Sequence, residues 1–338
     1  MTKRALGEDS NAADGNKGST ASVWQKCFSK TYSRDYWFNR TTGEKLWDDP
    51  SVNSASGEAV EKGAKRPRQE EVKSSSSAAR ETTPHTKVAI VVPFRDLHAE
   101  QERGKHLLEF IPFMTKFLAS AGACFHIYIV EQSDDSRKFN RGKLLNIGYD
   151  LAKKDNCNVF IFHDVDLLPS DELKSCYTQR PEKHPVHIAR VWSRYNDNPR
   201  YFGGVVSFSD DMFSSINGFP NNFWGWGGED DEMYNRTLRV GLTPTAPTAG
   251  SMRDMEKMGI HKKMAFLKAN RVLKCMNKTE VLQEHVQTWK SNGLSNLHYT
   301  EISREAPNDT CTKVTVDVEL NRGHWTDDRS GIADPQMD

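Results

Sequence analysis

The chain has 338 residues, with 46 basic and 46 acidic side chains and a formal net charge of zero. This length allows one substantial domain plus a small module, and the balanced charge predicts no direct binding of nucleic acid. No apolar run approaches the roughly 18 residues that span a bilayer, and the polar first residues predict neither a secretory signal nor a membrane anchor. Six scattered cysteines without a C-x-x-C pair argue against a zinc site and favour reduced thiols, although the sequence leaves a Cys157 to Cys176 pair open.

Composition divides the chain into five regions. We expect a disordered N-terminus over residues 1–21, a small module over 22–52, a flexible linker over 53–85, an α/β domain over 86–320 and a tail over 321–338. Aromatic side chains concentrate in the small module and are missing from the linker. The linker contains Lys65, Arg66 and Arg68, which form either a nuclear import signal or a solvated stretch.

The aromatic residues of the small module suit a three-stranded sheet. Trp24 and Pro50 bracket the segment, and Tyr36, Trp37 and Trp47 lie between them. So small a sheet needs an aromatic clasp, because it buries little core. The segment resembles a WW domain, which implies a clasp of Trp24, Trp37 and Pro50 and a groove of Tyr36 and Trp47 for Pro-rich peptides. An aromatic cluster that only packs is the alternative.

The α/β domain begins with strands and helices in alternation. Apolar runs at residues 88–92, 125–130 and 158–162 predict buried parallel strands. Apolar residues at helical spacing predict helices over 98–118, where Pro112 is a possible kink, and over 143–153. This order is typical of a doubly wound sheet, whose ligands lie beyond the carboxyl ends of the strands.

Two aspartates follow the third predicted strand directly. Asp164 and Asp166 are separated by one residue, so their side chains point the same way on an extended chain. Two carboxylates beside an apolar core need a cation or hydrogen-bond donors to neutralise them. A divalent ion that bridges to a diphosphate meets this need, and its hard ligands are oxygens. Structural aspartates at a strand end are an equally common explanation of such a pair.

A second stretch, residues 223–232, combines two tryptophans, three glycines and four acids. The glycines permit a loop that carries Trp224 and Trp226 over a ligand, as lids do. The acids then begin a helix, where carboxylates are electrostatically favoured. An acidic helix start after a glycine-rich loop is the simpler alternative, but it does not explain two tryptophans beside four acids.

The domain resembles the β-1,4-galactosyltransferase family over residues 87–318. The shared motifs occur in the family's order at residues 88–95, 139–146, 164–166, 201–204, 217–222, 224–231 and 293–297. The resemblance implies an α/β fold of the nucleotide-sugar-binding GT-A type, UDP-galactose as donor, Mn²⁺ as cofactor and a glycan or glycoconjugate as acceptor. It also makes residues 86–320 the catalytic domain.

The same resemblance implies the binding residues. Tyr201 would restrict the donor's 2-substituent and favour galactose. Metal ligands would be Asp166, His261 and Met258, with the methionine a soft partner for a hard ion. Leu97 stands where many members carry a second arginine, and residues 262–280 share little with the family. The donor-binding residues would be Pro93, Phe94, Arg95, Asp164, Val165, Tyr201, Gly204 and Trp226.

The implied chemistry is an inverting transfer. Asp230 would take the proton from the acceptor hydroxyl, within hydrogen-bond reach of that oxygen. Glu229 and Asp231 would orient the acceptor, and Trp226 would close on the donor. The acceptor-binding residues would be Phe139, Arg141, Asp230 and Asp231.

Two alternatives and one conflict stay open at the sequence level. The chain could be an adaptor that recruits Pro-rich partners through a non-catalytic sugar-binding fold, or its donor could be UDP-N-acetylgalactosamine or UDP-glucose. The family usually works in the Golgi lumen behind an anchor, whereas a WW-like module is typical of nucleus or cytoplasm. We therefore expect nucleus or cytoplasm.

Overall fold

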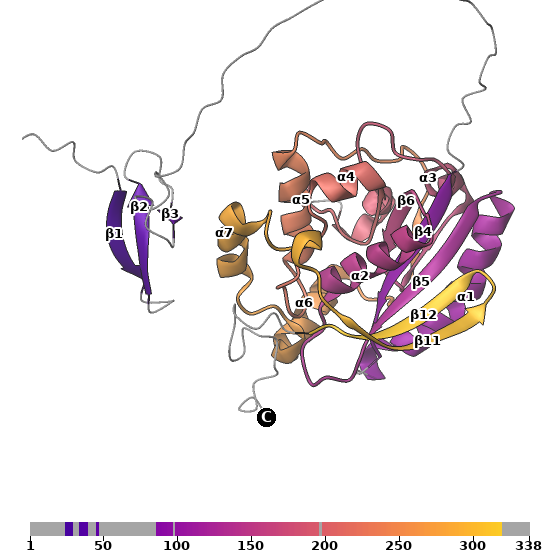
Figure 1. Ribbon diagram of the computed structural model, residues 1–338. Coiled ribbons are helices and arrows are strands. Elements are labelled where there is room, and N and C mark those ends of the chain that lie inside the picture. Colours follow the sequence, from indigo (N-terminus) through magenta and orange to yellow (C-terminus); the bar gives the residue numbers. More distant parts are fainter. Residues whose placement is uncertain are drawn as a thin grey trace, which may run out of the picture. The chain divides into compact units, whose positions relative to one another are not determined.

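The structure is a computed structural model that describes residues 24–29, 34–39, 45–46, 86–96, 99–195 and 198–319. The chain divides into two compact units, Met1–Ala79 and Arg80–Asp338 (Figure 1). Trp47, Pro50, Leu97 and the basic cluster of the linker lie outside the described residues. Within the described residues, the six cysteines are free thiols, including Cys157 and Cys176.

The smaller unit contains a three-stranded antiparallel sheet in the order β1-β2-β3, as the sequence predicts. Its strands are Trp24–Ser29, Arg34–Asn39 and Lys45–Leu46. Trp37 pairs with Lys26, two residues from Trp24, so both tryptophans lie on one face of the sheet. The clasp of Trp24, Trp37 and Pro50 stays a prediction, because Pro50 lies outside the described residues.

The larger unit is built on a seven-stranded mixed sheet in the order β11-β12-β5-β4-β6-β9-β8 (Figure 1). Strands β12, β5, β4 and β6 run parallel to one another, and β11, β9 and β8 pair antiparallel with their neighbours. The strands are β4 Lys87–Phe94, β5 Cys124–Gln132, β6 Val159–His163, β8 Val186–His187, β9 Val205–Ser209, β11 Thr300–Asn308 and β12 Cys311–Asp317.

Helices cover both faces of this sheet because alternate residues of the central strand β4 are apolar on both sides. Ile90 packs with Phe110 and Met114 of helix α1, whereas Val91 packs in a second core with residues of helix α2. Helix α2 lies very close to the sheet at Gly148, where a Cβ atom would come 2.2 Å from Val91 Cγ1. The two helices are α1 Arg103–Ser120 and α2 Arg141–Lys154.

Among the described residues, the remaining elements are a second sheet, five further helices and short 3₁₀ turns. A small second sheet pairs β10 Met252–Asp254 with β7 Leu167–Pro169. The other helices are α3 Lys174–Thr178, α4 Asp210–Ser215, α5 Glu229–Arg239, α6 Ile260–Ala269 and α7 Lys278–Thr288, with short 3₁₀ turns at Ala99–Gln101, Asp171–Leu173, Ile188–Val191, Ser193–Tyr195, Arg271–Leu273 and Leu294–Asn296.

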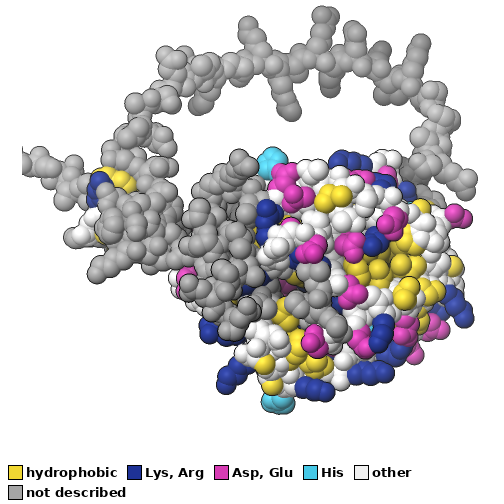
Figure 2. All heavy atoms as spheres, turned by 90° about the horizontal axis from the view of Figure 1, so that it is seen from below, with side chains coloured by type: hydrophobic (Ala, Val, Ile, Leu, Met, Phe, Trp, Pro, Cys, Tyr) yellow, Lys and Arg dark blue, Asp and Glu magenta, His cyan; other side chains and the backbone are white. Residues whose placement is uncertain are grey.

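The predicted parallel strands and both predicted helices are confirmed. Helix α1 begins at Arg103, later than predicted, because a 3₁₀ turn precedes it, and it continues through Pro112. The antiparallel edge strands were not predicted. Acidic and basic side chains are interspersed on the face of the larger unit that Figure 2 shows. None of the described helices has the length and apolar character that crossing a bilayer requires.

Candidate active site

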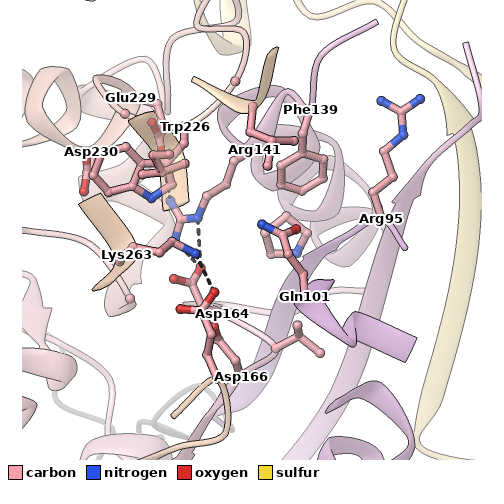
Figure 3. A pocket seen from close by; sticks show the side chains of 18 of the residues that line it. Arg95, Gln101, Phe139, Arg141, Asp164, Asp166, Trp226, Glu229, Asp230 and Lys263 are labelled. Carbon is pink, nitrogen blue, oxygen red and sulfur yellow. Dashed lines mark hydrogen bonds and ion pairs between the residues drawn. The ribbon is translucent and has the colours of Figure 1, made fainter. Parts of the chain in front are cut away.

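A cavity of about 440 Å³ opens beyond the carboxyl ends of β4 and β6 (Figure 3). This position is the one predicted for a ligand site in a doubly wound sheet. The cavity brings together the predicted donor, acceptor and catalytic residues of the larger unit: Pro93, Phe94, Arg95, Phe139, Arg141, Asp164, Val165, Asp166, Tyr201, Gly204, Trp226, Glu229, Asp230 and Asp231.

The first aspartate after β6 is paired with an arginine of helix α2. Arg141 donates through Nε and Nη2 to Asp164 Oδ1, at 2.9 and 2.7 Å, and its Nη1 lies 3.5 Å from Glu229 Oε1. Burial raises the pKa of Asp164, and the Arg141 charge opposes that rise. Arg141 therefore neutralises one carboxylate and connects it to the start of helix α5.

The second aspartate, Asp166, belongs to a buried network of charges. Arg103 Nη1 lies 2.5 Å from Asp166 Oδ2, and Arg103 Nη2 lies 3.2 Å from Glu256 Oε1. Lys263 Nζ also bonds Glu256 Oε1, and Arg194 Nη1 lies 3.0 Å from Glu256 Oε2. Burial alone would raise the pKa of Asp166, but Arg103 and the other cations lower it to about 2. Asp166 is therefore ionised and neutralised by side chains of the chain itself.

The first turn of helix α5 presents three acids to the cavity. Burial, followed by the neighbouring Asp230 charge, raises the pKa of Glu229 to about 8. Burial and then the Asp231 charge raise the pKa of Asp230, and Asp231 itself is paired with Lys278. The Asp230 carboxylate lies against the backbone of Gly203, where a Cβ atom would come 2.6 Å from Oδ2. Asp230 is thus a half-buried carboxylate with an elevated proton affinity, which suits a general base.

The aromatic loop before helix α5 is anchored through its backbone. Gly225 donates to the Phe139 carbonyl at 2.8 Å, and Trp226 donates to the Leu273 carbonyl at 2.7 Å. Gly225 has φ of 85°, and a Cβ atom there would come 2.7 Å from the carbonyl carbon of Lys274. The Trp226 side chain remains 40% exposed at the cavity, where a bound sugar could meet its face.

A buried polar cluster supports this loop and helix from behind. Arg236, fully buried on α5, bonds Glu232, the Gly218 carbonyl at 2.9 Å and His285 Nδ1 at 3.0 Å. Burial, followed by the Arg236 charge, lowers the pKa of His285 to about 3, so its ring is neutral. Because Nδ1 accepts from arginine, Nε2 carries the proton and donates to Asn222 Oδ1 at 2.6 Å. This cluster fixes the direction in which helix α5 presents its first turn.

Arg95, one of the predicted donor-binding residues, is held in place by hydrogen bonds within the chain. Arg95 donates to the Arg137 carbonyl at 2.6 Å and to Asp135 Oδ1 at 3.0 Å, and its side chain is 7% exposed. Pro93 and Phe94, the last residues of β4, line the same wall. These contacts position the three residues that the resemblance assigns to the donor.

Two predicted metal ligands do not line the cavity. His261 is exposed at the second residue of α6, and Met258 is half-buried just before that helix, whereas Asp166 lies in the cavity wall. Among the described residues, no group of three His, Cys, Asp or Glu side chains is placed to hold a metal ion. Since Asp166 is already paired with Arg103, the residues present do not assemble a metal site, and the three-residue ligand set stays a prediction.

Several cavity residues were not predicted. They are mostly charged side chains from loops and helices outside the family motifs: Gln101, Arg103, Trp192, Arg194, Glu256, Lys263 and Lys278. A signal for Lys263 was available, because Lys263 and Leu267 share one face of a helix and both are buried. A lysine on a buried helix face usually has a charged partner or a ligand.

The fold and the site together define a class of protein. A mixed α/β sheet with acids at the ends of its parallel strands, a glycine-rich aromatic loop and a carboxylate suited to proton removal are features of the GT-A-type glycosyltransferase fold.

Comparison with known proteins gives the family. The N-terminal region of glycosyl transferase group 7 matches residues 45–179, and the N-terminal domain of galactosyltransferase matches residues 183–262. β-1,4-Galactosyltransferase 7 of Drosophila melanogaster is 32% identical over 250 residues, which are 71% of this chain and 73% of that protein. The chain belongs to the β-1,4-galactosyltransferase family.

Other relatives are similar over a smaller share of their length. β-1,4-Galactosyltransferase 1 of Mus musculus is 40% identical over 173 residues, 49% of this chain and 40% of its own. β-1,4-Galactosyltransferase 4 of Mus musculus is 35% identical over 235 residues, 68% of this chain and 63% of its own. The chain therefore spans less than two thirds of these two relatives.

Two solved structures of the Drosophila enzyme have the same fold. The catalytic domain of β-1,4-galactosyltransferase 7 in complex with xylobiose superposes with a TM-score of 0.58 at 28% identity, covering 74% of this chain and 99% of that one. A mutant of the same enzyme in complex with manganese, UDP-Gal and xylobiose gives a TM-score of 0.59 at 28% identity, with the same coverage of both chains.

Proposed function

We propose that this chain transfers galactose from UDP-galactose to a sugar hydroxyl, with inversion and formation of a β-1,4 linkage. The family supports the reaction class, and the solved complex of the fly enzyme with UDP-Gal and xylobiose supports the donor and a sugar acceptor. The observation that carries the proposal is the position of Asp230, a carboxylate with a raised pKa at the start of α5, in one cavity with Trp226 and the donor residues.

The reaction divides among residues on the cavity wall. The acceptor oxygen attacks the anomeric carbon of galactose, its proton passes to Asp230, and the bond from that carbon to the diphosphate breaks. Asp231 and Glu229 would orient the acceptor, and Arg141 holds Glu229 relative to Asp164. Negative charge develops on the leaving diphosphate, so the cations of the cavity would stabilise the transition state more than the ground state.

Manganese is the cofactor that the comparisons support, because the related fly enzyme was solved with it. When bound, such an ion supplies positive charge to the leaving diphosphate. Asp166 is the cavity carboxylate that would face it, and the ligand set of Asp166, His261 and Met258 is kept as the sequence-based proposal.

A transfer assay tests the proposed function. We expect the full chain to release UDP from UDP-galactose when xylobiose or a related sugar acceptor is added, and Asp230→Asn to lose at least about a hundredfold in rate. Asp211→Asn is a matched control, because Asp211 also lies in the first turn of a helix but is exposed and pairs with Arg180. Equal activity of Asp230→Asn and Asp211→Asn would refute the role of Asp230. No transfer from any UDP-sugar to any acceptor would favour the adaptor hypothesis.

We further propose that the small sheet binds Pro-rich peptides as a WW-type module. Its three antiparallel strands and the shared face of Trp24 and Trp37 support this. Calorimetry of the full chain with a Pro-rich peptide should show binding that Tyr36→Ala and Trp47→Ala weaken. Unchanged binding in both variants would exclude the proposed groove.

We keep nucleus or cytoplasm as the proposed cell compartment, on the sequence alone. The comparisons give no support to nucleus or cytoplasm, and imaging of a tagged chain, with and without Lys65, Arg66 and Arg68 changed to Ala, tests it. Localisation confined to the Golgi would refute it.

A further inference from the structure

Three cations converge on one buried glutamate in the cavity wall. Glu256 has a side chain only 4% exposed, and it bonds Arg103 and Lys263 through Oε1 and Arg194 through Oε2. We call Arg103, Arg194 and Lys263 the cationic cluster. They come from the first residue of α1, the turn at Ser193–Tyr195 and the middle of α6, and two further carboxylates complete the network, because Arg103 also pairs with Asp166 and Arg194 with Asp254.

The position of this cluster relates it to the donor rather than to packing. Arg103 reaches Asp166, the second aspartate after β6, and in Figure 3 Lys263 points toward the carboxylates of Asp164 and Asp166. All three cations line the cavity. Each of these cations has a carboxylate partner, and burying such pairs is costly, so their position at the cavity wall rather than in the apolar core indicates a role at the ligand site.

Arg103 and Lys263 have more N–H groups than their hydrogen bonds to Asp166 and Glu256 use. Arg103 donates once to Asp166 and once to Glu256, although a guanidinium carries five N–H groups. Lys263 donates to Glu256, although an ammonium carries three. Glu256, which Arg194 also bonds, holds both charged groups in place at the cavity wall, so a ligand there would not need to order them.

We propose that Arg103 and Lys263, held by Glu256 and Arg194, bind the diphosphate of the donor nucleotide directly, so that the nucleotide binds without a divalent ion. This inference rests on the proposed function. Diphosphate oxygens accept strong charge-assisted hydrogen bonds from guanidinium and ammonium groups. Manganese would then strengthen an affinity that already exists without it.

The structure also answers the question that the sequence raised about the two aspartates. Two carboxylates at a strand end need a positive partner, and a divalent ion was the expected one. In this structure Arg141 forms an ion pair with Asp164, and Arg103 forms one with Asp166. The two carboxylates are therefore neutralised without an added cation, and Arg103 and Lys263 line the same cavity as both of them.

Calorimetry with UDP tests this inference without any turnover. We expect the full chain to bind UDP in excess EDTA, and Lys263→Met to weaken that binding by at least about tenfold, because it removes one charge-assisted contact. Lys262→Met is the matched control, since Lys262 is the exposed neighbour of Lys263 on the same helix, and it should bind as the wild type does. Lys263→Arg keeps the charge and should retain most of the affinity. If a thermal melt shows that Lys263→Met is unfolded, Arg103→Gln replaces it.

The outcomes separate the inference from the proposed function. UDP binding that is lost in EDTA and restored by Mn²⁺ would overturn direct binding by the cluster and leave the galactosyltransferase proposal standing. Equal affinity of Lys263→Met and Lys262→Met in EDTA would likewise overturn it. No UDP binding in either EDTA or Mn²⁺ would overturn the nucleotide-sugar donor, and the inference with it.

Discussion

Replacing Arg141 with methionine isolates what its pairing with Asp164 contributes to folding. The change keeps an apolar stem against Phe219, whose ring lies 6.0 Å from the guanidinium, and removes the charge and both hydrogen bonds to Asp164. Breaking a buried ion pair on one side costs about 3–5 kcal/mol. The Asp164 side chain is 30% exposed, so water can solvate the unpaired carboxylate and offset part of this cost. We therefore expect the free energy of unfolding to fall by about 2–3 kcal/mol near neutral pH.

The loss depends on pH with a definite sign. Burial already raises the pKa of Asp164 above 3.8, and loss of Arg141 would raise the folded-state pKa further. A carboxyl with a raised folded pKa destabilises the fold when it is ionised, and this penalty disappears as pH falls through that pKa toward the unfolded value. The deficit of Arg141→Met relative to wild type should therefore be full near neutral pH and smaller in acid.

Urea unfolding of both proteins at about pH 7.5 and about pH 5 measures this difference, since other carboxyl groups titrate in both and cancel. A double variant with Asp164→Asn should recover much of the deficit, because no unpaired buried charge remains. A deficit below about 1 kcal/mol, or one that is equal at both pH values, would refute the reasoning.

Two further changes probe the loop and the acidic helix start. Gly225→Ala should lower stability by about 1–3 kcal/mol in thermal melts, because it combines positive φ with a clash against Lys274. Gly241→Ala is the control, since Gly241 has φ of 79° with open space where the Cβ would lie, and it should lose less stability. Equal losses in the two variants would show that the clash does not contribute. Glu229→Gln should gain stability relative to wild type as pH rises from 4.5 through about 8, because the folded wild type resists ionising there; a melting difference that does not change with pH would contradict the raised pKa.

The sequence predicted those parts of the structure that depend on neighbours along the chain. Strands β4, β5 and β6 are buried on both faces, so each is a continuous apolar run that needs no knowledge of its partners. Because parallel strands end at one edge, Asp164 and Asp166 could be placed at a ligand site from their position alone. The antiparallel strand β9 was missed, since Val205–Ser209 is short and mixes apolar residues with serine.

The network of buried ion pairs around Asp166 and Glu256 could not be predicted from the sequence, for a different physical reason. Asp166 pairs with Arg103 from 63 positions away, and Arg103 pairs with Glu256 across 153 positions. No spacing rule connects such residues, because their proximity follows from how the fold brings the start of α1 and the segment between β10 and α6 to the end of β6. The sequence therefore predicted that the two aspartates need positive partners, but it assigned that role to a metal ion rather than to Arg141 and Arg103.

The distribution of charge in the cavity has a direct bearing on the chemistry. Proton removal requires a carboxylate that binds a proton readily, and departure of a diphosphate requires fixed positive charge. The raised pKa of Asp230 and the cationic cluster around Glu256 supply these opposite conditions within one cavity. Arg141, which is bonded to Asp164 and reaches Glu229, lowers the pKa of Asp230, but burial and the Asp231 charge outweigh that effect. The site therefore keeps a carboxylate of raised pKa beside fixed cations because burial, rather than distance from positive charge, sets the proton affinity of Asp230.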